Sequence, residues 1–354
     1  MTVFMGSPPG HLQSRADMSS PAPERCFNLG TGDKYYSLKI VQDGRDQYPW
    51  LAVTGFGSHI KSTRKMLVVG KDRSLEEYPI DRVGHLLIVG GHTIHSAAIT
   101  ALVKAGAMVS FFEADGEPVG YIRRYGEHRD EYLAARQREL PAHRFAVRIA
   151  EGAIRSRLLV IEETSHETGM EILYQGELEI LHQALSEIEY LIRLEEVGRL
   201  NRLIHDMYYE IMARSIPPEY EFRRRTSRPY RDVINAMLSF GYAMLFGNAC
   251  IAILGARLDP DAGTLFPGER SLVYDLIEPM KADMIDRPVF SLARSGISPR
   301  DYESSGTRTI LSDPCMKQMI ALFHGSIKQD RIEEQVTVFH DALLGQREFA
   351  VVYR

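Results

Sequence analysis

The stretch VINAMLSFGYAMLFGNACIAILGA, residues 233–256, decides the fold class of this chain. It holds no charged residue and is long enough to cross a bilayer, so it forms either a membrane span or the central helix of a helical domain. Four polar residues recur along it, namely Asn235, Ser239, Tyr242 and Asn248. No second apolar stretch of this length accompanies it in the sequence. The pattern favours a buried central helix.

Helical periodicity continues on both sides of this stretch, from about residue 140 onward. Apolar residues recur at spacings of three and four in five further segments, which are 145–163, 177–212, 271–285, 313–327 and 330–345. The second half of the chain is therefore predicted to be entirely helical.

The first half follows a different pattern. Short apolar runs rich in β-branched and aromatic residues alternate with turns, which is typical of strands, and one helical pattern lies at 94–102. We predict an α+β fold, with a small N-terminal β-rich domain with one helix (35–122) and a larger all-α C-terminal domain (140–354). A polar hinge, 123–139, joins them, and residues 1–34, rich in Pro, Ser and Gly, form a flexible tail.

The composition is that of an ordinary globular protein, with 44% apolar and 25% charged residues among 354. The net charge of −5 gives no global indication of nucleic-acid binding, so such binding requires a local basic surface. The cysteines, Cys26, Cys250 and Cys315, are far apart and form no CxxC pair, which argues against a disulfide framework or a structural zinc site. The N-terminus lacks the apolar run of a secretory signal. We predict a cytoplasmic protein that does not associate with membranes.

The strongest basic cluster lies just before the apolar stretch, in FRRRTSRPYRD, 222–232. Its candidate DNA-binding residues are Arg223, Arg224, Arg225, Arg228, Tyr230 and Arg231. Guanidinium groups pair with phosphate oxygens, so the cluster suits a nucleic-acid backbone. A solvated loop that neutralises the acidic helices around it has the same composition, and the spacing alone leaves both interpretations open.

Two carboxylates follow the apolar stretch one helical turn apart, Asp275 and Glu278 in SLVYDLIEP, 271–279. Paired carboxylates hold Mg²⁺ or Mn²⁺ while phosphate oxygens complete the shell, which is the arrangement of metal-assisted phosphodiester chemistry. Acidic helix faces are also common on soluble proteins. The pair therefore makes a metal site a hypothesis and does not establish one.

Three stretches, in this order, resemble one family, the CRISPR-associated adaptation endonucleases and integrases called Cas1. They are LLIVGGHTIHSAAITALVKAGAMVSFFEADGEPVG (86–120), RPYRDVINAMLSFGYAMLF (228–246) and LDPDAGTL followed by SLVYDLIEP (258–279). The resemblance covers roughly residues 35–345. It implies an N-terminal β-domain that forms a homodimer, a helical C-terminal domain that carries a Mg²⁺ or Mn²⁺ site, and DNA and the Cas2 protein as partners.

The resemblance also implies which positions hold the metal. They are a Glu seven residues before a Tyr-Tyr pair, the His of an L-H turn, and the Asp of D-L-x-E. These positions carry Asn201, Phe266 and Asp275 in this sequence, so only Asp275 keeps its family identity. Lys281 stands where the family has an Arg, and it joins the candidate DNA-binding residues.

The two substituted residues are poor ligands. Phe266 has no lone pair, and Asn201 offers one neutral oxygen where a hard cation favours a charged one. Glu278 or His205, which lies four residues after Asn201, could substitute for the missing ligands. A different helix register would instead bring in Glu195 or Glu196. We therefore expect metal binding to be weak or absent.

Three hypotheses for function follow. The first is a catalytically impaired Cas1 homologue, a DNA-binding homodimer that acts as a partner or scaffold in CRISPR adaptation. The second is an active metal-dependent nuclease and integrase with a rearranged ligand set. The third is a protein-interaction scaffold without DNA binding, which is favoured only if the arginine cluster is buried in salt bridges.

Overall fold

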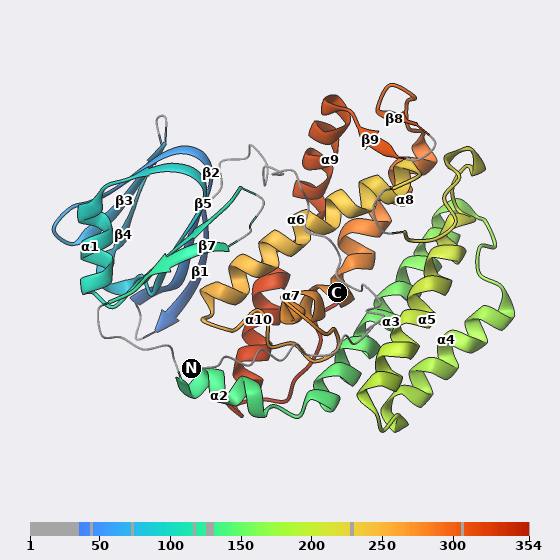
Figure 1. Ribbon diagram of the computed structural model, residues 1–354, viewed down its shortest axis with the longest axis horizontal. Coiled ribbons are helices and arrows are strands. Elements are labelled where there is room, and N and C mark those ends of the chain that lie inside the picture. The colour runs from blue at the N-terminus through green and yellow to red at the C-terminus, as the bar shows by residue number, and fades with distance from the viewer. Residues whose placement is uncertain are drawn as a thin grey trace, which may run out of the picture.

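The computed structural model describes residues 35–42, 45–71, 74–114, 116, 118–124, 131–226, 230–305 and 308–353. A β-sheet domain is followed by a mostly helical part (Figure 1), so the predicted α+β fold is confirmed. The tail predicted at 1–34 lies outside the described residues, as do Cys26 and part of the predicted hinge. The described part of that hinge includes the short helix α2, Glu131–Glu139.

One sheet organises the first domain. Its strands are β1 (Tyr35–Gln42), β2 (Arg45–Ser62), β3 (Met66–Lys71), β4 (Ser74–Pro79), β5 (His85–Ile94), β6 (Met108–Phe112) and β7 (Pro118–Ile122). They lie in the order β4-β3-β2-β5-β6-β7, and β1 pairs with β2. The β2–β5 and β5–β6 pairs are parallel, and helix α1 (Ser96–Lys104) connects β5 to β6. The other pairs of this sheet are antiparallel, and β4, β7 and β1, which pairs only with β2, lie at its edges.

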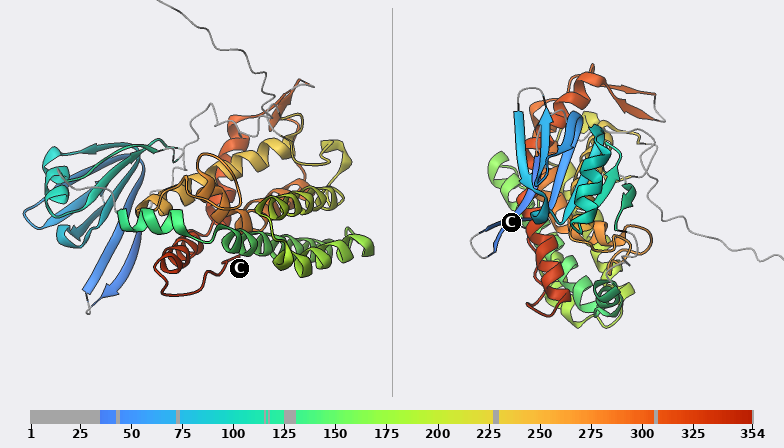
Figure 2. Two further views of the ribbon diagram at one scale, coloured as in Figure 1. Left: turned by 60° about the horizontal axis from the view of Figure 1, so that its bottom comes forward. Right: turned by 90° about the vertical axis from the view of Figure 1, so that its left-hand side faces the viewer.

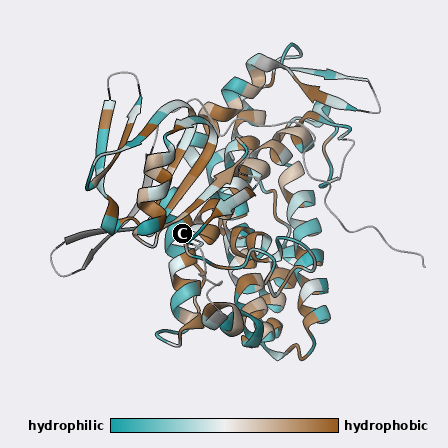
Figure 3. Ribbon diagram, turned by 60° about the vertical axis from the view of Figure 1, so that its left-hand side comes forward, coloured by the Kyte–Doolittle hydropathy of each residue, from teal (hydrophilic) through white to brown (hydrophobic). Residues whose placement is uncertain are grey.

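Both faces of the central strands are buried. Because alternate side chains of a strand point to opposite faces, neighbouring residues of one strand belong to different cores. Leu51 and Val53 of β2 belong to the core beneath α1, while Ala52 between them belongs to the core of the helical domain. Apolar residues accordingly run along these strands in Figure 3. At the turn after β6, Gly116 approaches Gly247 so closely that an added Cβ would lie 2.5 Å from its Cα. The sheet is thus packed directly onto the helices.

His85 lies at this contact. It is fully buried, its Nε2 lies 2.8 Å from Ser110 Oγ, and the backbone of Gly255 and Leu254 faces it from the helical domain. Burial lowers the pKa of His85 to about 4. Between that value and about 6.5 the unfolded chain binds the additional proton, so this group costs stability as the pH falls through the window.

We therefore expect the His85→Gln variant to lose less stability than the wild type between pH 7.5 and pH 5, by about 2 kcal/mol. Urea unfolding at a series of pH values measures the difference in slope. His95→Gln, a substitution of an exposed histidine at the start of α1, is the matched control and should follow the wild type. Parallel slopes for His85→Gln and the wild type would contradict a neutral buried His85.

The helical part is built around α6 (Val233–Gly255), as Figures 1 and 2 show. The other long helices are α3 (Ala142–Thr168), α4 (Gln175–Glu187), α5 (Leu194–Ala213), α9 (Asp313–Ser326) and α10 (Gln329–Leu343). Helix α6 is long and apolar enough to cross a membrane, but 67% of its most apolar window is buried inside the protein. That burial is the pattern of a core helix. Cys250 within it and Cys315 in α9 are buried, and neither forms a disulfide with a described residue.

The structure differs in three places from the elements that the sequence pattern predicts. Strand β4 was not predicted, because its sequence SLEEYP is polar, as suits an exposed edge. The short hairpin of β8 (Tyr302–Ser304) and β9 (Thr309–Leu311) was also missed, since strands of three residues carry almost no pattern. The helical pattern at 177–212 is interrupted after the turn Ile188–Tyr190, where Leu191 leaves the helical conformation.

Candidate functional site

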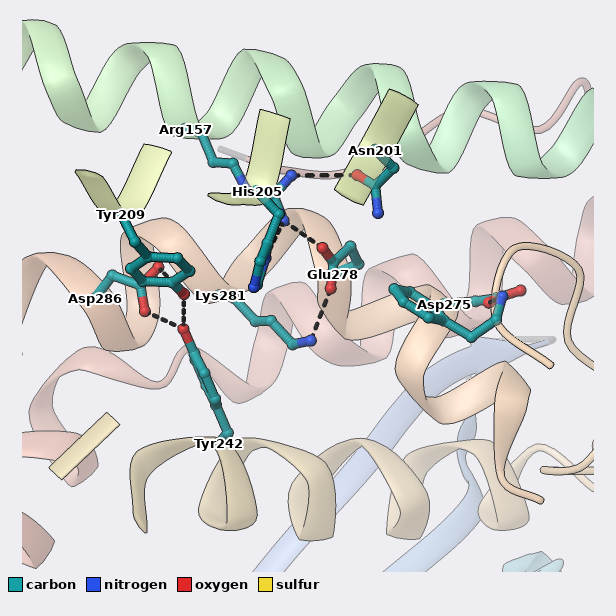
Figure 4. Close-up of polar contacts among 10 residues, drawn as sticks. Arg157, Asn201, His205, Tyr209, Tyr242, Asp275, Glu278, Lys281 and Asp286 are labelled. Atoms are coloured by element: carbon teal, nitrogen blue, oxygen red, sulfur yellow. Dashed lines mark hydrogen bonds and ion pairs between the residues drawn. The ribbon is translucent and has the colours of Figure 1, made fainter. Parts of the chain in front are cut away.

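The candidate site lies where α3, α5 and the segment after α7 (Ser271–Ile277) meet. Helix α5 contributes Asn201 and His205, which lie four residues apart and therefore on one face. Glu278 begins a 3₁₀ turn, Glu278–Met280, where Pro279 cannot continue the α-helical hydrogen bonding. All of these side chains point toward Arg157 of α3 (Figure 4).

The guanidinium of Arg157 lies between these three side chains. It is 3% exposed, and it donates to Asn201 Oδ1 at 3.2 Å and to His205 Nδ1 at 3.3 Å. It also forms a short ion pair with the carboxylate of Glu278. Because a guanidinium has no acceptor, His205 Nδ1 must accept. Burial, reinforced by the charge of Arg157, lowers the pKa of His205 to about 3, so the ring is neutral at physiological pH.

Lys281 supplies a second cation to the same carboxylate. Its Nζ donates to Glu278 Oε2 at 2.7 Å, on the oxygen that Arg157 does not contact. Burial alone would raise the pKa of Glu278, but Lys281 and Arg157 together hold it well below its ordinary value. Glu278 is therefore a permanently charged carboxylate whose two oxygens are both taken.

Asp275 is engaged elsewhere. Its Oδ2 accepts hydrogen bonds from the backbone N–H and hydroxyl of Thr264. The backbone N–H groups of Leu265 and Phe266 also point at this carboxylate, the latter at 3.0 Å from Oδ1. Burial raises the pKa of Asp275 to about 6, although these hydrogen bonds favour its charged form. The carboxylate is thus held by the turn that precedes α7, through Thr264, Leu265 and Phe266, and not by the group around Arg157.

Phe266, by contrast, lies beside the site. Its ring is 5.7 Å from Lys281 Nζ and 6.3 Å from the ring of Tyr274. Lys281 Nζ lies between this ring and that of Tyr242, 5.4 Å away. Of the three family ligand positions, 201 and 266 therefore lie near Glu278. The carboxylate at the third position, Asp275, instead accepts hydrogen bonds from the turn before α7. Glu195 and Glu196, the shifted-register candidates, lie in the first turn of α5, and Glu196 accepts from the backbone N–H of Arg193.

A tyrosine–aspartate group adjoins the site. Asp286 accepts a short hydrogen bond from Tyr242 and another from Tyr209 at 3.2 Å. It ends a π-helical segment, Ala282–Asp286, and such segments are frequent at functional sites. Burial raises the pKa of Asp286 to about 6 despite these hydrogen bonds. Asp286 thus anchors Tyr209 of α5 and Tyr242 of α6 beside the site.

The arginine segment leads into the N-terminus of α6. Arg223, Arg224 and Arg231 are exposed, whereas Arg228 lies outside the described residues. Arg225 is turned inward, where it donates to Asn235 Oδ1 at 2.6 Å and to Ser239 Oγ at 2.9 Å. Its guanidinium also lies 5.1 Å from the ring of Tyr242, so Arg225 links the segment to the site. Tyr230 is partly buried, and its carbonyl accepts from Thr309 in β9.

Sequence reasoning missed Arg157. Its segment, AIRSRLLVIEE, contains two arginines at a spacing of two, and nothing in the spacing says which is buried. Arg155 is exposed and pairs with Glu151 one turn earlier on α3, as an ordinary surface arginine does. The signal that could have identified Arg157 is its position among the buried residues of α3, between Ile154 and Ile161.

The donor atoms at this site are of the kinds that bind a divalent ion, but they are occupied. Asn201, His205 and Glu278 are an amide oxygen, an imidazole nitrogen and a carboxylate, all of which bind divalent metals in proteins. Their converging atoms, however, already hold Arg157, and within the described ranges no group of three or more His, Cys, Asp or Glu residues could hold a metal ion. The residues present do not fit the ion.

Comparison with known proteins places the chain in a family. The model of the family "CRISPR associated protein Cas1" matches residues 51–325. A protein of Methanospirillum hungatei named as CRISPR-associated endonuclease Cas1 2 is 41% identical over 84% of this chain and 99% of its own length. The CRISPR-associated endonuclease Cas1 1 of Thermus thermophilus is 28% identical over 82% of this chain and 94% of its own.

Solved structures show the same fold. A casposase bound to an integration product superposes with a TM-score of 0.72 at 18% identity, covering 86% of this chain and 98% of that one. A partial Cas6–RT–Cas1–Cas2 complex gives 0.69 with the same coverage and identity, and a TtCas1–DNA complex gives 0.56 over 87% of this chain and 98% of that one. The family model and the 41% identical relative show that the chain belongs to the Cas1 family of CRISPR-associated proteins.

Proposed function

We propose that this protein is a DNA-binding Cas1 homologue of CRISPR adaptation that holds DNA without cutting or joining it. One observation carries the proposal, namely that the guanidinium of Arg157 lies where Asn201, His205 and Glu278 converge. A nuclease of this family needs a divalent ion to polarise the phosphodiester and to activate water. This chain instead holds the buried guanidinium of Arg157 there, which supplies no such water.

The DNA-binding half of the proposal rests on the arginine segment. Three of its side chains, Arg223, Arg224 and Arg231, are exposed and stand next to the start of α6. Their exposure argues against the scaffold hypothesis, which requires the cluster to be buried in salt bridges. Solved relatives in complex with DNA and with Cas2 support both as partners, and a cytoplasmic location would give access to them.

We expect DNA binding to persist in EDTA and to weaken steeply with salt. Replacing Arg223, Arg224 or Arg231 singly with Gln should lower the slope of log K against log [salt] by about one unit each and should weaken binding equally for unrelated sequences. Fluorescence anisotropy with labelled duplexes measures both quantities. Arg155→Gln, which removes an exposed arginine on α3, is the matched control and should leave the slope unchanged. Binding that vanishes in EDTA would contradict the metal-independent account.

We also propose that the protein is a homodimer formed through its β-domain. Strand β7 is an edge, and its side chains at Val119 and Tyr121 are 65% and 58% exposed. Edge strands that expose apolar residues favour pairing with a second strand, and these two residues share one face because they alternate.

The Val119→Lys, Tyr121→Lys double variant is expected to run as a monomer in light scattering, where the wild type runs as a dimer. Leu75→Lys changes an exposed residue on the opposite edge, β4, and should leave the dimer intact. A dimer that dissociates only with Leu75→Lys would move the interface to that edge, and a dimer that survives both changes would exclude the β4 and β7 edges as the interface.

A further inference from the structure

Three groups that could each bind a metal ion converge on one buried cation. The amide oxygen of Asn201 and the ring nitrogen of His205 come from α5, and the carboxylate of Glu278 comes from the turn after α7. They reach the guanidinium of Arg157 from different directions (Figure 4). Acceptors of these three kinds can surround a metal ion, and here they surround the guanidinium of Arg157.

Glu278 is likewise paired with positive charges of the chain itself. Arg157 contacts one of its oxygens and Lys281 the other, so both oxygens of the carboxylate are paired with fixed cations of the chain. His205 is neutral and accepts a hydrogen bond from Arg157, as a metal-bound imidazole would give its lone pair to the metal. Both cations are largely buried, with side chains that are 4% and 15% exposed.

We propose that Arg157 replaces a divalent ion at Glu278, and that it masks a latent metal site formed by Asn201, His205 and Glu278. This ligand set differs from the one the family resemblance implies, because its imidazole comes from α5 and its carboxylate is not Asp275. The site holds α3, α5 and the segment after α7 together without a metal. The proposal deepens the proposed function and rests on it for its biological meaning.

The alternative for Arg157 is an ordinary buried ion pair whose removal leaves only a cavity. The two cases differ in what happens when the guanidinium is deleted. If the acceptors form a latent metal shell, a divalent ion of suitable radius restores the contact between the three elements. If they do not, deletion destabilises the protein and no ion reverses the loss.

The test is a titration of the DNA-free, full-length protein with Mn²⁺, by isothermal calorimetry and by thermal unfolding in EDTA and in Mn²⁺. We expect no site-specific binding and no change in melting temperature for the wild type. Arg157→Ala should melt lower than the wild type in EDTA, bind one Mn²⁺, and recover roughly 5 °C or more in excess Mn²⁺. Arg155→Ala, two residues away and exposed, should match the wild type in both conditions.

Adding Glu278→Gln to Arg157→Ala should abolish the recovery, because the only carboxylate of the shell is lost. Arg157→Gln serves if the alanine variant does not fold, since it removes the charge and keeps a hydrogen-bond donor. A wild type that binds one Mn²⁺, with the binding lost in Glu278→Gln, would overturn the proposal even if neither Arg157 variant were soluble. So would folded Arg157 variants that bind no more Mn²⁺ than the wild type.

These readouts contain no DNA and no cleavage step. A protein that failed to bind DNA would disprove the proposed function and leave the Mn²⁺ titration unchanged. Conversely, Arg157 variants without Mn²⁺ binding would remove the latent site and leave the salt-dependent DNA binding as it was. The two failures are therefore distinguishable.

Discussion

The Asp275→Ala variant is expected to lose roughly 3 to 5 kcal/mol of unfolding free energy, an effect on folding and not on catalysis. The carboxylate receives the backbone N–H groups of Thr264, Leu265 and Phe266, and all of these groups are buried or partly buried. Without the carboxylate the three donors lose the acceptor that they share. The turn that places Phe266 beside Lys281 should then open.

Chemical denaturation measures this loss, and Asp206→Ala, at an exposed position on α5, is the control that should stay within about 0.5 kcal/mol of the wild type. Asp275→Asn should also be strongly destabilised, because both carboxylate oxygens accept and an amide offers only one acceptor. A fully stable Asp275→Ala protein would mean that the turn is held by other contacts, and it would return Asp275 to the list of available ligands.

The second large effect is expected from rebuilding the site with Arg157→Ala, Asn201→Glu and Phe266→His together. The triple variant should bind Mn²⁺ at least about a hundredfold more tightly than Arg157→Ala alone, because it adds a charged oxygen and a second imidazole beside Glu278. Calorimetric titration compares the two.

The double exchange Asn201→Glu, Phe266→His is the decisive control. From the sequence, these two changes alone should restore a carboxylate–imidazole–carboxylate set. The structure predicts that they do not, because a glutamate at 201 would pair with Arg157, whose guanidinium already donates to that position. Equal Mn²⁺ affinity in the double and triple variants would show that Arg157 moves aside freely.

The sequence predicted the fold because its strongest signals are local. The uncharged run of α6 and the helical periodicity around it depend on residues a few positions apart, as do the alternating strands. What it missed was the polar edge strand β4 and the small hairpin β8–β9, neither of which buries a regular face.

The site could be predicted only in part, because its contacts join residues that are far apart in the sequence. Glu278 was recognised as a substitute ligand, and positions 201 and 266 do lie near it. The partner that matters, Arg157, lies 121 residues from Glu278 in the chain, and no spacing rule connects them. Nor does spacing show that Asp275, one helical turn before Glu278, turns its carboxylate to a backbone turn. Long-range side-chain pairing needs the three-dimensional arrangement.

We propose that a fixed arginine has replaced the catalytic ion, and a nuclease and strand-joining assay tests this proposal most directly. The unmodified protein is incubated with branched and duplex DNA in Mn²⁺, in Mg²⁺ and in EDTA, and cleavage and strand joining are scored on denaturing gels. We predict DNA binding in all three conditions with no metal-dependent cleavage or joining in any. Robust Mn²⁺-dependent cutting that Glu278→Gln abolishes would contradict the account, because it would show a working metal where the structure places Arg157.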